Sequence, residues 1–175
     1  MRTLVLGGIR SGKSRWAETA LVDESVVRYV ATGVTVDSDP SWARRVAVHR
    51  ERRPESWHTV ETADVATVLR DDPATATLVD DLGSWLTATL DRRGWDGGSV
   101  TSDVDELVGA VETFTGPLAL VSPEVGLTVV AATASGRRFT DELGTLNQRL
   151  ALCCEQVVLV VAGLPVWVKP TKALS

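Results

Sequence analysis

Short runs of consecutive apolar residues alternate along this chain with longer segments in which apolar residues recur every three or four positions. The short runs predict buried strands, and the longer segments predict amphipathic helices. The predicted strands cover residues 4–6, 26–31, 59–61, 77–81, 117–122, 157–162 and 166–169. The predicted helices cover residues 14–22, 39–52, 65–69, 85–90, 104–114 and 138–154.

The predicted strands consist largely of Val and Leu, which is typical of parallel strands that are covered on both faces. Because these strands alternate with helices, we expect an α/β fold with a mostly parallel sheet and helices on both faces. The turn signal at residues 163–165 predicts that the last strand, 166–169, returns antiparallel. We find no internal repeat and no linker, so we expect residues 1–175 to form a single domain.

The run between the first predicted strand and the first predicted helix matches the phosphate-binding pattern G-x-x-x-x-G-K-[ST]. Glycines let the backbone turn its N–H groups toward phosphate oxygens, and the helix N-terminus adds a partial positive charge. Lys13 is expected to reach the β and γ phosphates, and Ser14 to bind Mg²⁺. The loop therefore predicts binding of a nucleoside triphosphate. Its sequence is Gly7-Gly8-Ile9-Arg10-Ser11-Gly12-Lys13-Ser14.

An acid at the end of a second strand is expected to complete the metal site of such a loop. Asp80 directly ends the apolar run of residues 77–79 and is the preferred candidate, with Asp81 second. The alternative is that the acid only caps the helix that follows. Ser14 and Asp80 are thus the predicted ligands of Mg²⁺.

Cationic side chains crowd one short segment of the chain, and its members are Arg44, Arg45, His49, Arg50, Arg52 and Arg53. Arginine binds phosphate through two parallel hydrogen bonds, whereas the ordinary alternative for a charge run is a solvated helix face. The spacing leaves three roles open for His49: a proton carrier, a nucleophile toward phosphorus, or a surface residue. The second histidine, His58, is interpreted as structural.

The net charge of −5 disfavours a nucleic acid partner, because nucleic acid phosphates are negative as well. The longest apolar stretch, residues 157–168, is shorter than the roughly 20 residues that span a bilayer. The first apolar run, residues 3–6, is too short for a signal peptide. Cys153 and Cys154 are adjacent and are expected to stay reduced. We therefore expect a cytoplasmic protein without a membrane span.

Further motifs follow the phosphate loop in a fixed order. They are Tyr29-Val30-Ala31-Thr32, His49 ahead of Arg53-Pro54, Trp57-His58-Thr59-Val60-Glu61, Val79-Asp80, Glu124-Val125-Gly126, Gly136 to Gly144, and Asn147-Gln148. This series resembles the bifunctional adenosylcobinamide kinase / adenosylcobinamide-phosphate guanylyltransferase family of cobalamin biosynthesis. The resemblance extends from residue 2 to about residue 163 and is far more specific than the loop alone.

The resemblance implies a P-loop NTPase core of the RecA type that uses GTP, ATP and Mg²⁺. Such enzymes phosphorylate adenosylcobinamide, then transfer GMP from GTP to adenosylcobinamide phosphate through a guanylylated histidine, which by motif position is His49. Family members form homotrimers with the site near a subunit boundary. The positions that would contact GTP are Gly7 to Ser14, Ala31, Thr32, Gly33, Arg50, Glu51, Arg52, Arg53, Glu61 and Asp80.

The chain departs from the family pattern around residues 123–131, where Pro123 replaces the usual Asn in a loop expected to shape the corrinoid pocket. Glu124 ends a buried strand and is a candidate to accept the proton of a substrate hydroxyl. Arg137, Arg138 and Asp141 either contact phosphate or form a helix cap and a local ion pair. Two other functions stay open: a small-molecule kinase without a covalent histidine, and a non-catalytic GTP-binding regulatory protein.

Overall fold

The computed structural model describes residues 1–33, 54, 56–127 and 131–169, and these residues contain a seven-stranded sheet. Its order is β3-β2-β4-β5-β1-β6-β7. β7 pairs antiparallel with β6, and all other neighbouring strands pair parallel, which confirms the predicted sheet. The strands are β1 (Arg2–Gly7), β2 (Val27–Ala31), β3 (Trp57–Glu61), β4 (Thr77–Asp80), β5 (Leu118–Pro123), β6 (Gln156–Val161) and β7 (Leu164–Lys169).

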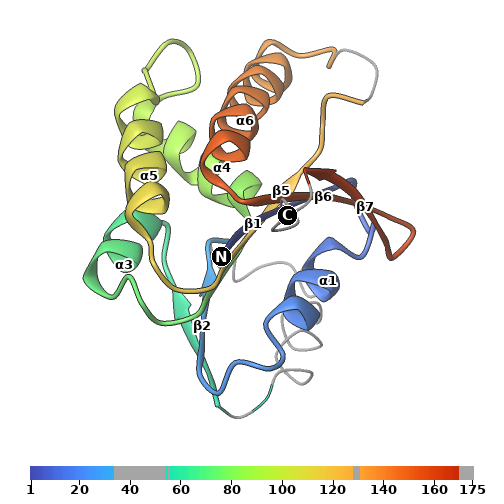
Figure 1. Ribbon diagram of the computed structural model, residues 1–175. Helices are drawn as coiled ribbons and strands as arrows, with labels where there is room; N and C mark the ends of the chain where they lie inside the picture. The colour runs from blue at the N-terminus through green and yellow to red at the C-terminus, as the bar shows by residue number, and fades with distance from the viewer. Residues whose placement is uncertain (34–53, 55, 128–130, 170–175) are drawn as a thin grey trace.

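Helices cover both faces of this sheet, as predicted (Figure 1). α3, α4, α5 and α6 pack on one face, and α1 packs on the other. The bounds of the described helices are α1 (Lys13–Ala20), α3 (Val65–Asp71), α4 (Leu82–Arg93), α5 (Thr101–Thr113) and α6 (Ala134–Cys153).

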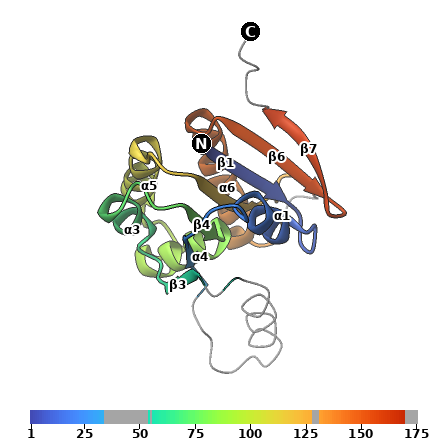
Figure 2. The same cartoon turned by 60° about the horizontal axis from the view of Figure 1, so that its bottom comes forward.

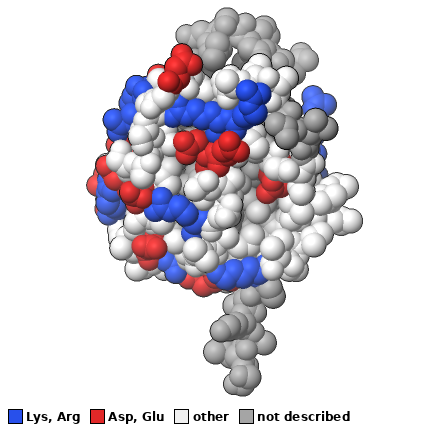
Figure 3. Space-filling model, turned by 90° about the horizontal axis from the view of Figure 1, so that it is seen from above, with Lys and Arg blue, Asp and Glu red and all other residues white. Residues whose placement is uncertain are grey.

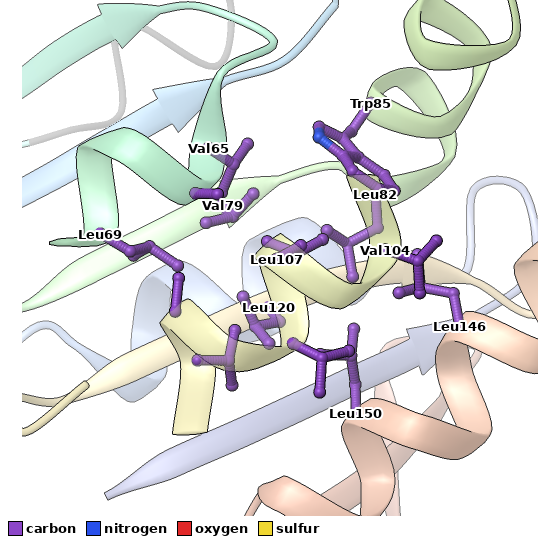
Figure 4. Packing of buried hydrophobic residues seen from close by; sticks show 14 of the residues in the cluster. Val65, Leu69, Val79, Leu82, Trp85, Val104, Leu107, Leu120, Leu146 and Leu150 are labelled. Atoms are coloured by element: carbon purple, nitrogen blue, oxygen red, sulfur yellow. The ribbon is translucent and has the colours of Figure 1, made fainter. Parts of the chain in front are cut away.

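The sheet separates two apolar clusters, because successive residues of a strand point to opposite faces. Leu4 of β1 belongs to the larger cluster, whereas its neighbour Val5 belongs to the smaller one around Ala17 of α1. In the larger cluster, Leu107 of α5 and Leu146 of α6 gather with side chains of the sheet (Figure 4). Full burial of such a side chain contributes about 1.5–3 kcal/mol. The strands are therefore held on both faces, which fixes the positions of their carboxyl ends.

Three helices begin three or four residues earlier than the apolar pattern predicts. One of them, α5, begins at Thr101 rather than at residue 104 and has no side-chain cap. Polar residues cap the other two. The Asp81 carboxylate accepts the Ser84 N–H at 2.7 Å, so α4 begins at Leu82 rather than at residue 85. The Thr133 hydroxyl accepts the Gly136 N–H at 3.1 Å, so α6 begins at Ala134 rather than at residue 138. α4 also ends later than predicted, at Arg93 rather than at residue 90.

The predicted helix over residues 39–52 lies outside the described residues. None of the described helices is long and apolar enough to cross a membrane.

Cys154 is buried beside the sheet, and this burial raises the pKa of its thiol to about 12. On the face seen in Figure 3, cationic and anionic side chains lie close together. Asp103 forms ion pairs with both Arg92 and Arg93, at 2.7 and 2.9 Å.

Candidate functional site

The phosphate loop joins the end of β1 to the start of α1, and two of its glycines are required by its shape. A Cβ on Gly7 would lie 2.3 Å from the Ser11 hydroxyl oxygen and 2.9 Å from the Val160 carbonyl oxygen. Gly12 has a φ of 93°, in the left-handed region that side chains with a Cβ rarely adopt. The first glycine therefore permits close approach, and the second permits the turn into α1.

The turn between β6 and β7 supports this loop from the side. The Gly163 N–H donates to the Ser11 carbonyl oxygen at 2.7 Å, and the Ser11 N–H donates to the Gly8 carbonyl oxygen at 3.2 Å. β6 lies next to β1 in the sheet, so this hairpin stands beside the loop despite its distance in sequence (Figure 2). The loop backbone is thus held in shape by residues about 150 positions further along the chain.

The loop presents groups that suit a phosphate anion. No side chain caps α1 at Gly12, so the positive end of this helix faces the loop uncapped. The Lys13 ammonium lies 3.4 Å from the Gly8 carbonyl oxygen, over the loop that it is expected to serve. Gly8 and Arg10 are exposed, so the loop is open to an incoming ligand.

Asp80 contacts the phosphate loop where the loop continues into α1. The Ser14 hydroxyl donates to Asp80 Oδ1 at 3.2 Å, and the Tyr29 hydroxyl donates to Asp80 Oδ2 at 2.6 Å. Asp81 points elsewhere, since its carboxylate caps α4 and its carbonyl oxygen accepts the Thr32 hydroxyl at 2.5 Å. Of the two acids at the end of β4, the first therefore faces the loop and the second forms the helix cap.

The donor set fits a magnesium ion. Mg²⁺ prefers oxygen ligands and is usually held by one or two protein groups, with phosphate and water completing the octahedron. Ser14 and Asp80 supply a hydroxyl and a carboxylate oxygen at hydrogen-bond distance from each other. In the described part of the chain, no group of three or more His, Cys, Asp or Glu residues forms a metal cage. The pair is therefore suited to an ion that arrives with a nucleotide.

The other predicted positions lie along the same edge of the sheet. Ala31 ends β2 and pairs with Asp80 of β4 on one side and with Glu61 of β3 on the other. Thr32 and Gly33 follow directly, with Thr32 buried and Gly33 half-buried. The carboxyl ends of β3, β2 and β4 thus form a row that continues through β5 to the loop. Open α/β sheets bind ligands at such edges.

The structure does not describe the cationic segment. His49, Arg50, Glu51, Arg52 and Arg53 lie outside the described residues, so their predicted roles stay predictions. His58, interpreted as structural, lies exposed on β3 between the buried Trp57 and the exposed Thr59.

The two arginines near the start of α6 bind the backbone of their own chain. Arg138 donates to the carbonyl oxygens of Gly94 at 2.9 Å and Trp95 at 2.6 Å, and it also bonds the Gly98 carbonyl. Arg137 donates to the Ala131 and Ala132 carbonyl oxygens at 3.1 and 2.9 Å. Of the alternative of a helix cap and a local ion pair, the structure contains the ion pair, between Arg138 and Glu142 at 4.0 Å, whereas Thr133 caps α6. Contact of these arginines with phosphate stays a prediction.

Sequence reasoning did not identify a role for Tyr29, the only tyrosine of the chain. Its side chain is 4% exposed, yet its hydroxyl reaches the Asp80 carboxylate. The pairing of β2 with β4 brings the two residues together, and this pairing joins strands separated by β3 in the sequence. The contact between Tyr29 and Asp80 can therefore be recognised only from the register of β2 against β4, and the order of residues along the chain does not specify this register.

A family model and the related proteins point to the same family. The family model described as cobinamide kinase / cobinamide phosphate guanyltransferase matches residues 3–168. The bifunctional adenosylcobalamin biosynthesis protein CobP of Pseudomonas aeruginosa is 40% identical over 176 residues, covering 97% of this chain and 98% of that protein. The bifunctional adenosylcobalamin biosynthesis protein CobU of Escherichia coli K12 is 34% identical over 189 residues, covering 97% of this chain and 100% of that protein.

Two solved structures resemble the chain at low sequence identity. The P4 protein from bacteriophage phi6, in complex with ADP, is 14% identical with a TM-score of 0.49, covering 97% of this chain but 55% of that protein. The flagellar accessory protein FlaH from Methanocaldococcus jannaschii is 12% identical with a TM-score of 0.46, covering 95% of this chain and 77% of that protein. Both scores lie below 0.5, so the fold rests on the strand order and the phosphate loop of this chain.

Proposed function

Since this chain belongs to the cobinamide kinase / cobinamide phosphate guanyltransferase family, we propose that it phosphorylates adenosylcobinamide with ATP or GTP and then transfers GMP from GTP to the product, giving adenosylcobinamide-GDP. The observation that carries this proposal is the contact between Ser14 and Asp80 at 3.2 Å. This contact places the acid at the end of β4 beside the phosphate loop. Both reactions need this arrangement, because both use a triphosphate.

The loop residues Gly7 to Ser14 hold the triphosphate through their amides and Lys13. In the kinase reaction, the terminal phosphoryl group passes to the substrate hydroxyl and a nucleoside diphosphate leaves. In the second reaction, pyrophosphate leaves, and the loop and Lys13 stabilise the charge that develops on it. Ser14 and Asp80 would hold Mg²⁺, which would neutralise phosphate charge when bound.

His49 is the proposed nucleophile of the second reaction, on the strength of its motif position. A neutral imidazole nitrogen attacks the α-phosphorus, a P–N bond forms, and the bond to the bridging oxygen breaks as pyrophosphate leaves. A phosphate oxygen of adenosylcobinamide phosphate then attacks the same phosphorus, and the P–N bond breaks. Ala31, Thr32, Gly33 and Glu61 line the GTP site in this proposal, together with Arg50, Glu51, Arg52 and Arg53.

We also propose a homotrimer, as in the family that the sequence resembles. β7 supports association because it is an edge strand with apolar side chains in solvent: Leu164 is 70% exposed and Trp167 is 47% exposed. We further propose that residues 1–175 act as one domain in the cytoplasm, with adenosylcobinamide and its phosphate as substrates and no nucleic acid partner.

Covalent labelling separates the two-step enzyme from its alternatives. Incubation with Mg²⁺ and GTP labelled at the α-phosphorus should leave acid-labile label on the chain. His49→Ala should remove the label, and His58→Ala, which alters an exposed histidine of β3, should retain it. Kinase turnover without any label would favour a simple small-molecule kinase. GTP binding without kinase turnover or pyrophosphate release would favour a regulatory protein.

A further inference from the structure

Glu124 stands between the two halves of the predicted triphosphate site. β5 lies between β4, which ends in Asp80, and β1, which leads into the phosphate loop. Glu124 directly follows β5, and its N–H donates to the Gly7 carbonyl oxygen at 3.1 Å. The backbone of this half-buried residue is therefore anchored to the first residue of the loop, at the sheet edge where the other site residues gather.

The side chain lines a cavity beside the loop. The cavity has a volume of about 420 Å³ and lies between loop residues 8–11 and residues 159–162 at the end of β6. Leu127 and Glu124 complete its lining, so its ionisable groups are Glu124 and Arg10. A largely apolar hollow with one carboxyl group and one guanidinium suits a short aliphatic chain that carries a hydroxyl group close to a phosphate, whereas a corrin macrocycle would have to remain outside.

The carboxylate is oriented but not neutralised. Its Oε1 accepts the Gly126 N–H at 2.7 Å, which holds the side chain in the loop after β5. Across the part of the chain that the structure describes, no lysine or arginine forms an ion pair with it. Glu124 therefore presents a carboxyl group at the cavity wall.

The other acids of this edge are engaged differently. Both oxygens of Asp80 accept hydrogen bonds, from Ser14 and Tyr29, and the Asp81 carboxylate caps α4. Glu61 lies on β3, three strands away from β5. Among the described strand-end acids, Glu124 is the one that faces both the loop and the cavity.

We propose that this cavity receives the hydroxyl-bearing arm of the phosphoryl acceptor and that Glu124 is the general base of the kinase reaction, an inference that rests on the proposed function. The Glu124 carboxylate takes the proton of the acceptor hydroxyl, and the hydroxyl oxygen forms a bond to the γ-phosphorus. The bond between that phosphorus and the β–γ bridging oxygen breaks, and the nucleoside diphosphate leaves. Glu124 then releases its proton to solvent.

The two reactions of the proposed enzyme make this role testable. The acceptor in the first reaction is an alcohol, which must lose a proton, whereas the acceptor in the second is a phosphate that is already anionic. Glu124→Gln keeps the size of the side chain and removes its basicity. It should lower the kcat of adenosylcobinamide phosphorylation by about 100-fold, the usual scale for a general base, and affect KM much less. GMP transfer to separately supplied adenosylcobinamide phosphate should fall far less.

Two further variants serve as controls for this experiment. Glu124→Asp keeps a carboxylate and should recover part of the kinase rate. Glu106→Gln alters an exposed glutamate of α5, remote from the loop, and should match the unmodified protein in both reactions. A kinase kcat within threefold of normal in Glu124→Gln, or an equal loss in both reactions, would overturn the inference. Absence of both reactions from the unmodified protein would instead overturn the proposed function, and this inference with it.

A rim substitution tests what the cavity holds. Val161 is 53% exposed at the end of β6, so Val161→Trp should fold normally while narrowing the cavity. We expect the KM for adenosylcobinamide to rise at least fivefold, with the Kd for GTP unchanged. An unchanged KM, or a rise in the Kd for GTP instead, would contradict the assignment of the cavity to the acceptor.

Discussion

The Tyr29 hydroxyl donates a hydrogen bond to Oδ2 of Asp80 at 2.6 Å, while Ser14 donates to Oδ1 of the same carboxylate. The buried tyrosine thus sets the direction in which the acid presents its other oxygen to the phosphate loop. A residue that orients a metal ligand influences metal affinity without touching the ion. Tyr29 is therefore a positioning residue for the proposed magnesium site.

Tyr29→Phe removes this hydrogen bond and keeps the ring in the core. The free energy of unfolding should fall by about 1.5–3 kcal/mol, the range for a hydrogen bond to a charged group. The Mg²⁺ concentration for half-maximal nucleotide binding should rise about tenfold, as is typical for loss of an orienting partner. Titration of a fluorescent GTP analogue with Mg²⁺ measures this shift.

Trp57→Phe provides the matched control, since it alters a buried aromatic residue of neighbouring β3 whose indole nitrogen has no hydrogen-bond partner among the described residues. It should lower stability and leave the magnesium dependence unchanged. Equal magnesium dependence in both variants would argue against the positioning role.

Lys13→Ala should weaken both proposed reactions, because both require the triphosphate to be held in the loop. Loss of a charged hydrogen bond of about 2 kcal/mol corresponds to a roughly 30-fold higher Kd for GTP. Lys169→Ala is the control: its ammonium donates to the Ala151 and Cys154 carbonyl oxygens at 2.8 and 2.6 Å, so it should lower stability and leave the Kd unchanged. Retained GTP affinity in Lys13→Ala would count against the loop as the triphosphate site.

Gly12→Ala tests the backbone of the loop. Alanine at a φ of 93° costs about 1–3 kcal/mol, and the added Cβ would lie 3.1 Å from the Gly163 Cα. We expect a lower melting temperature together with loss of GTP binding.

Gly109→Ala offers a matched comparison, because a Cβ at that position in α5 meets no atom within 4 Å. It should stabilise the protein by about 0.5–1 kcal/mol and preserve GTP binding. Unimpaired GTP binding in Gly12→Ala would show that the left-handed turn is dispensable.

Glu155 links the start of β6 to β1 through its ion pair with Arg2, whose Nε donates to Glu155 Oε1 at 3.0 Å. The hydrogen bond from Arg2 lowers the pKa of Glu155 from 4.5 to about 2. A depressed pKa in the folded state stabilises the protein above pH 4.5, and this contribution is lost as the pH falls toward 2. Glu155→Gln should therefore lower the melting temperature at pH 7, with a difference from the unmodified protein that shrinks below pH 4.5. A constant difference across that range would show that the ion pair is not its cause.

The sequence by itself determined the alternation of strands and helices, the phosphate loop and the choice of Asp80 over other acids. These features are local: apolar runs report burial, and the loop is a contiguous pattern whose function follows from backbone geometry. Helix starts were predicted less well at Leu82, Thr101 and Ala134. The caps of α4 and α6 precede the apolar stripe by several residues, and α5 begins without a side-chain cap.

Only the tertiary structure decided which distant groups meet. The Tyr29–Asp80 contact depends on the register of β2 against β4, and the hydrogen bond from the Gly163 N–H to the Ser11 carbonyl oxygen depends on β6 lying beside β1. The same holds for Arg138, whose guanidinium binds backbone carbonyls 40 to 44 residues away in the sequence. Strand order and register arise from packing of the whole sheet between its two apolar clusters, and no contiguous stretch of sequence contains them.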